Sequence, residues 1–212
     1  MTDSSMRCCT RLFRLCCLVL MLVASPASQG NDIVARNAVL SPSEDGYTLA
    51  ADFTVNLNAR LDEAIARGIA LYFVVEFELT RSRWYWLDEQ VVSRSQTFQL
   101  SYHALTRQYR LYSGALHQSF TSLDDALRIM SRVRNWQVID KNQLRPDQSY
   151  QAAVRMRLDL SQMPKTFQVN ALANRDWSLS SEWVRWAVIG ADSAPGPGNS
   201  SGSPVAGPVE AR

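Results

Sequence analysis

Hydrophobic and polar residues alternate along most of the chain, with the period of two that is typical of β-strands with one buried face. The clearest run is YTLAADFTVNL, in which every second residue from Tyr47 to Leu57 is apolar. In IALYFVVEFELT the first half is apolar at both parities, which predicts a central strand covered on both sides, and Glu76 and Glu78 then face outward. The predicted strands span residues 47–57, 69–80 and 149–160, a hairpin over 97–112 that turns near 105–108, and weaker segments at 33–40, 167–172 and 182–189.

Two segments change to the spacing of three and four residues that predicts an amphipathic helix. Leu61 and Ile65 belong to the first, and Gly68 follows it as a C-terminal stop. The second is SLDDALRIMSRVRNW, residues 122–136, where Ser122 is placed to cap the first turn with Asp125 three residues later. Its apolar stripe is Leu123, Ala126, Leu127, Met130 and Val133, and its solvated face carries Arg128, Arg132 and Arg134.

Many antiparallel-looking strands around one core favour a mainly β domain over residues 31–190. We expect an antiparallel β-sandwich of the immunoglobulin-like kind, with the two short helices as connections. The alternative is an α+β fold with a single antiparallel sheet and the helices on one face. Residues 191–212 are rich in Pro, Gly and Ser without an apolar period, so they are predicted to be a disordered tail.

The first 27 residues have the layout of a secretory signal peptide: a basic start, a short apolar run and small residues around Pro26. Cleavage after Ala27 would remove all four cysteines, Cys8, Cys9, Cys16 and Cys17, which makes a metal site or disulfide there a poor hypothesis. We therefore expect a periplasmic protein without a stable transmembrane span in the mature chain. The alternative is an inner-membrane protein anchored through an uncleaved leader.

Charge argues against a nucleic-acid partner. The whole chain has 22 Lys+Arg and 20 Asp+Glu, and the leader contains three Arg and one Asp. Subtraction leaves 19 of each in the mature chain, which is neutral and lacks the basic footprint that nucleic-acid binding needs.

Candidate catalytic groups are few. No G-x-S-x-G nucleophile motif is present, and the ordered domain has too few glycines for a phosphate-binding loop. His103, near the predicted hairpin turn, and His117, in a predicted loop, lack the spacing of a zinc pair. Glu76 and Glu78 share one strand face and could form a carboxylate pair, although outward acidic residues on strands are usually solvated. We expect no cofactor, no metal and no catalytic residue.

Aromatic residues are the richest feature, and RSRWYW concentrates them at the end of the predicted central strand. Three adjacent aromatic residues cannot all face one side of a strand, so at least one is expected near the surface beside arginine. Such residues are common anchors of protein interfaces and also bind sugars or lipids. The predicted partner-binding residues are Arg81, Arg83, Trp84, Tyr85 and Trp86.

Several long blocks resemble the family called domain of unknown function 4390. They are RSRWYW, FQLSYHALTRQYRL, SLDDALR followed by RNW, MPKTFQVNAL, and DWSLSSEW, and the resemblance covers residues 33–188. The resemblance implies an exported protein of Gram-negative bacteria, associated with genes for two-component sensor kinases, and it brings no assigned activity. We expect a non-catalytic regulatory or adaptor module with an envelope protein partner. The alternatives are a binder of envelope glycan or lipid and a hydrolase with a carboxylate or histidine site.

Overall fold

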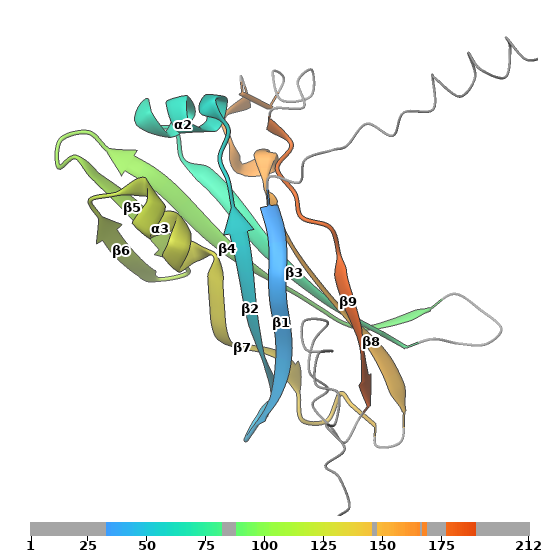
Figure 1. The fold of residues 1–212 in the computed structure, drawn as a ribbon. Helices are drawn as coiled ribbons and strands as arrows, with labels where there is room; N and C mark the ends of the chain where they lie inside the picture. Colours follow the sequence, from blue (N-terminus) through green and yellow to red (C-terminus); the bar gives the residue numbers. More distant parts are fainter. Residues whose placement is uncertain (1–32, 82–87, 146–147, 166, 169–176, 190–212) are drawn as a thin grey trace, which may run out of the picture. The chain divides into compact units, whose positions relative to one another are not determined.

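The computed structural model describes residues 33–81, 88–145, 148–165, 167–168 and 177–189. Most of these residues lie in strands, and two short α-helices connect them (Figure 1). The elements are β1 (Ile33–Ser43), β2 (Gly46–Val55), α2 (Ala59–Ala66), β3 (Leu71–Arg81), β4 (Glu89–His103), β5 (Gln108–Ser113), β6 (Leu116–Phe120), α3 (Leu123–Met130), β7 (Arg132–Asp140), β8 (Ser149–Leu158), the 3-10 turn η1 (Leu160–Gln162) and β9 (Val184–Ile189).

The strands form two antiparallel sheets. The smaller sheet has the order β1-β2-β7, and the larger has the order β6-β5-β4-β3-β8-β9. A mainly β fold is therefore confirmed, and the alternative of a single sheet is wrong. The reason is that β2 pairs with β1 and β7 only, which separates these three strands from the meander that β3 begins.

Alternation correctly located the principal strands. The runs at 47–57, 69–80 and 149–160 form β2, β3 and β8, and the hairpin forms β4 and β5. The weaker segments at 33–40 and 182–189 correspond to β1 and β9. The segment at 167–172 was predicted wrongly at its start, because Phe167 and Gln168 are helical and donate to the carbonyl of Pro164; residues 169–172 lie outside the described residues.

The second predicted helix is shorter than its apolar stripe suggested. It ends at Met130, and Val133 lies in β7, so residues 132–136 are strand. Ser122 occupies the N-cap position but its side chain makes no capping hydrogen bond. Two of the arginines predicted to face water have ion-pair partners: Arg128 with Asp125 and Arg134 with Asp52.

The first helix ends as predicted. Gly68 has a φ of +82°, and its N–H donates to the carbonyl of Ile65 at 2.8 Å. Its start depends on Asn58, whose side chain accepts from the N–H of Leu61 at 3.0 Å.

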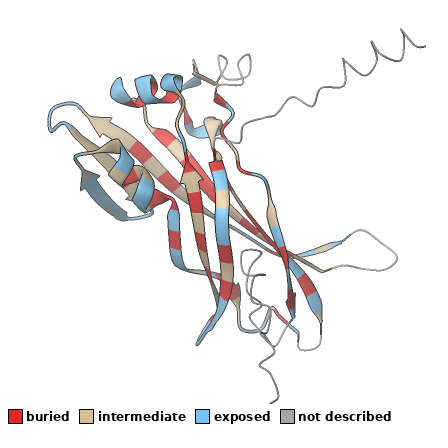
Figure 2. Cartoon of the chain, in the orientation of Figure 1, coloured by how far each residue is buried: buried red, intermediate tan, exposed pale blue. Residues whose placement is uncertain are grey.

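Buried side chains from both sheets and both helices belong to one hydrophobic core cluster. Figure 2 shows buried positions alternating with more exposed ones along the strands. In β3 the inward residues Leu71, Phe73, Val75, Phe77 and Leu79 are completely buried. The central strand of the prediction is thus confirmed, since β3 lies between β4 and β8 in the larger sheet.

Candidate functional site

The outward face of β3 carries Glu76, which joins two strands through ion pairs. Its carboxylate accepts from Arg155 Nε at 2.6 Å and from Arg157 Nε at 2.9 Å, both on β8. The register of β3 against β8 explains both contacts. Glu76 is directly opposite Arg155, and Arg157 is opposite Val74, the next residue on the same face of β3. Side chains on one face of neighbouring antiparallel strands are close enough for such pairs.

Asp159 extends this cluster beyond the end of β8. It lies 3.5 Å from Arg157 Nη1 and accepts hydrogen bonds from the N–H and hydroxyl of Ser161. Burial alone would raise the pKa of Glu76, but hydrogen bonds from Arg155 and Arg157 and their positive charges hold it below its usual value. Burial would also raise the pKa of Asp159. Hydrogen bonds from Ser161 and Gln162 and the positive charge of Arg157 outweigh burial, so the pKa of Asp159 is lowered as well. Both carboxylates are therefore fixed anions at neutral pH.

Trp183 covers one side of the cluster through a bulge in the chain that precedes β9. Val154 pairs with Val184, but Arg157 bridges Ser180, so the 180–184 side has one more residue than the β8 side. The hydroxyl of Ser181 accepts from the N–H of Met156 at 3.0 Å within this bulge. The Arg155 guanidinium carbon then lies 4.4 Å from the ring centroid of Trp183. Bulges commonly redirect a side chain in this way.

Of the groups considered for acid–base chemistry, the two carboxylates are neighbours on β3 and the two histidines lie apart. His117 was predicted in a loop, but it lies in β6, opposite Tyr112, because an edge strand pairs through its backbone whatever its side-chain pattern. His103 ends β4, as expected near the hairpin turn. Strand spacings place His103 and His117 roughly 17 Å apart, and Glu76 roughly 20 Å or more from either. Glu78 faces outward next to Glu76 along β3, with no ion-pair partner among the described residues.

Arg81 is the described member of the predicted partner-binding segment. It ends β3, donates from Nη1 to Gln148 Oε1 at 2.7 Å and forms an ion pair with Glu89. An open cavity of 580 Å³ lies beside it, lined also by Thr80, Asp88, Ser149, Tyr150, Gln151 and Ala187. Arg83, Trp84, Tyr85 and Trp86 lie outside the described residues.

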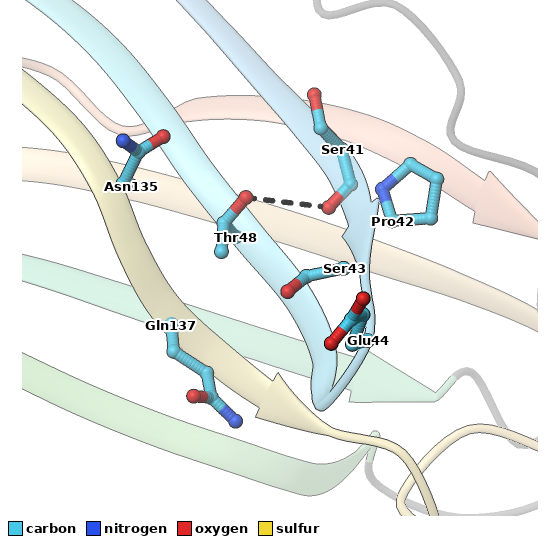
Figure 3. A pocket seen from close by; sticks show the side chains of 7 residues that line it. All are labelled: Ser41, Pro42, Ser43, Glu44, Thr48, Asn135 and Gln137. Carbon is cyan, nitrogen blue, oxygen red and sulfur yellow. Dashed lines mark hydrogen bonds between the residues drawn. The ribbon is translucent and has the colours of Figure 1, made fainter.

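A second open cavity lies on the smaller sheet and was not found from the sequence (Figure 3). It measures 790 Å³ and is lined by Ser41, Pro42, Ser43, Glu44, Thr48, Asn135 and Gln137. Asn135 has a φ of +50° at a register irregularity of β7 against β2. Asn tolerates this backbone conformation better than most residues, and that preference was the available signal. The cavity is lined by hydroxyl and amide groups, one carboxylate and the ring of Pro42, without an aromatic or basic group.

Two further observations concern the described part of the chain. None of its helices is long and apolar enough to cross a bilayer. It also contains no group of three His, Cys, Asp or Glu side chains arranged to hold a metal ion.

The site geometry defines a mainly β domain with fixed ion pairs and open, polar cavities. The family model of the domain of unknown function DUF4390 matches residues 30–187, and the chain belongs to this family. This confirms the resemblance seen in the sequence blocks. No curated protein and no solved structure matches the chain.

Proposed function

We propose that this protein is a non-catalytic module of the bacterial cell envelope, exported through residues 1–27, that acts by binding a protein partner. A regulatory or adaptor role towards the periplasmic region of a two-component sensor kinase is the specific form of the proposal. The two sheets, which share one hydrophobic core, would form a sandwich that serves as the rigid support.

The positions of the two candidate histidines and of Glu76 among the described residues support a binding role over the hydrolase alternative. A general base must come within about 3 Å of its proton, directly or through one water molecule. The two candidate histidines are several times that distance from each other and from Glu76. Glu76 and Glu78 are neighbours on one strand face, but Glu76 is committed to its two arginine partners. Glu76, with its lowered pKa, is also unsuited to take up and release a proton near neutral pH.

The single observation that carries the proposal is the placement of Arg81. Ion pairing with Glu89 and the hydrogen bond to Gln148 fix its guanidinium at the end of the central strand, beside the 580 Å³ cavity. The aromatic run Trp84–Trp86 follows three residues later in the sequence. Segments that follow rigid strands often bind partners, and Arg, Trp and Tyr dominate interface energies.

A capture experiment tests the partner contact. The purified mature chain is immobilised, and the periplasmic region of a sensor kinase from the same bacterium is titrated over it. Arg83→Ala and Tyr85→Ala should each weaken capture by at least about tenfold, since truncating an interface anchor costs on the order of 2 kcal/mol. Arg132→Ala, at an exposed position of the other sheet, is the matched control and should have no effect.

Both test variants should keep the melting temperature of the wild type. Full capture by both variants would remove this segment from the proposal, and no capture of the kinase by the wild type would remove the kinase. Sequencing the exported protein tests the leader: the first residue should lie between about Pro26 and Asp32, and a retained Met1 in the membrane fraction would favour the anchored alternative.

Catalysis is tested separately by one variant that carries Glu76→Gln, Glu78→Gln, His103→Ala and His117→Ala. If the protein works by binding through the end of β3, this variant should complement a deletion strain once it is shown to be folded. Failure to complement by a folded variant would restore the hydrolase alternative.

A further inference from the structure

The outward face of β4 is a continuous strip without charge. Because Val92, Phe98 and Leu100 are buried on the inner side, the alternate residues face outward. We define the β4 strip as the outward residues Ser93, Ser95, Thr97, Gln99 and Ser101. Five successive outward positions therefore offer only hydroxyl and amide groups, whereas β3 and β8, on the same face of the sheet, carry Glu76, Glu78, Arg155 and Arg157.

Aromatic rings lie on both sides of this strip. Gln99 is opposite Tyr72 of β3 and opposite Tyr112 of β5, and Tyr112 is opposite His117 of β6. The four side chains thus form one row across four neighbouring strands, about 14 Å long at the usual strand spacing. The rings of Tyr112 and His117 are stacked, with centroids 5.7 Å apart and planes at 28°.

The polar groups of the strip have unused hydrogen-bonding capacity. Thr97, Gln99 and Ser101 are half-buried, yet their side chains make no hydrogen bond to any other described residue. The same holds for the hydroxyl groups of Tyr72 and Tyr112. Groups in this state are available to an external partner that both donates and accepts hydrogen bonds.

We propose that the β4 strip, with Tyr72, Tyr112 and His117, is a binding site for an uncharged carbohydrate chain of hexose or N-acetylhexosamine units. Sugar hydroxyls both donate and accept, which matches Ser, Thr and Gln side chains, and the apolar faces of sugar rings pack on Tyr rings. Described outward positions of β4, β5 and β6 contain no carboxylate and one arginine, Arg110, so a charged polymer finds little complementary charge.

A protein partner fits this surface less well. Interface centres are rich in Trp, Tyr, Arg and large apolar side chains, and they bury these side chains together. Here Tyr72 and Tyr112 are separated by the strip, which has only Ser, Thr and Gln side chains and no Arg or Trp. The carbohydrate site is also separate from the partner contact at Arg81, and its test does not depend on the outcome for that contact.

Isothermal titration of the mature chain with three hexasaccharides tests the inference: α-1,4-linked glucose, β-1,4-linked glucose and β-1,4-linked N-acetylglucosamine. At least one should bind. Gln99→Ala and Tyr112→Ala should each weaken that binding about tenfold, the loss expected when one good contact of about 1.4 kcal/mol is removed. Asn37→Ala, which removes an exposed amide from the other sheet, is the control for Gln99→Ala and should leave the binding unchanged.

Three outcomes would overturn the inference. The first is that none of the three hexasaccharides binds at millimolar concentration. The second is that a hexasaccharide binds and the strip variants leave its binding unchanged. The third is that no hexasaccharide binds and Gln99→Ala or Tyr112→Ala loses kinase capture. The last outcome assigns the surface to a protein interface. Variants at Arg83 and Tyr85 should not alter sugar binding, so the two proposals fail separately.

Discussion

Replacing Glu76 with Gln removes the charge from the centre of the cluster on β3 and β8 while keeping the shape of the side chain. Two hydrogen-bonded arginines then lose their anionic acceptor. The Glu76 side chain is only 19% exposed, and those of Arg155 and Arg157 are 32% and 33% exposed, so solvent cannot fully replace the lost contacts.

The magnitude follows from these exposures. Hydrogen bonds to charged groups contribute about 1.5–3 kcal/mol when buried, whereas exposed ion pairs contribute about 0.2–1 kcal/mol. Two contacts of intermediate burial place the expected loss at about 1.5–3 kcal/mol at pH 7. Glu78→Gln is the matched control, because Glu78 lies on the same strand face without an ion-pair partner among the described residues, and should change stability by less than about 0.5 kcal/mol.

The loss should also depend on pH. The pKa of Glu76 is lower in the folded state than its ordinary value of 4.5, so its stabilisation is fully present above that value. As the pH falls through the folded pKa, the carboxylate is protonated in both states and the stabilisation disappears. The difference between wild type and Glu76→Gln should therefore be constant from pH 6 to 8 and shrink below about pH 4.5.

Urea unfolding followed by tryptophan fluorescence, at several pH values, measures both effects. The reasoning is refuted if Glu76→Gln is as stable as wild type at pH 7, or if its loss stays undiminished in acid. An equal loss in Glu78→Gln would show that general charge on this face, rather than the two arginine contacts, is responsible.

Three further variants test local features. Asn58→Ala should lower stability by about 1 kcal/mol, because it removes the side-chain cap of α2. Ser122→Ala, at an N-cap without a side-chain hydrogen bond, should cost less than about 0.5 kcal/mol. Equal losses of the two variants in chemical denaturation would contradict this difference. Gly46→Ala should lower stability by about 3 kcal/mol or more in thermal unfolding. The reason is that the φ of Gly46 is +144° and a Cβ atom would lie 2.0 Å from the carbonyl oxygen of Ile139. A melting temperature equal to that of the wild type would show that the β1–β2 turn can rearrange. Ser181→Ala should cost about 1–3 kcal/mol by leaving the buried N–H of Met156 unpaired, and unchanged amide exchange at Met156 would argue against that role.

The sequence revealed those strands whose side chains alternate and missed those that depend on the backbone. β6 has almost no buried side chain, so nothing in LHQSF distinguishes it from a loop; its pairing with β5 alone makes it a strand. β7 was hidden because Val133 continued the apolar stripe of α3 and because the irregularity at Asn135 breaks the period of two.

The candidate site was predictable only in part. An outward Glu76 followed from alternation, but its partners on β8 depend on a register between strands far apart in the chain. The stacking of Trp183 on Arg155 depends on a one-residue bulge, and the local sequence pattern does not predict that bulge. The predicted site at the end of β3 is represented by Arg81, and its other members remain predictions.

The position of β3 between β4 and β8 has a consequence for how the chain acquires its fold. β4 follows β3 directly, but β4, β5, β6, α3 and β7 are all synthesised before β8. Until β8 arrives, β3, whose five inward side chains are completely buried in the finished fold, has one open edge, the condition under which strands pair with other chains. Glu76 and Glu78 project from the outward face of that strand, and we expect their negative charge to disfavour pairing with a second unfinished chain before Arg155 and Arg157 join Glu76 to β8.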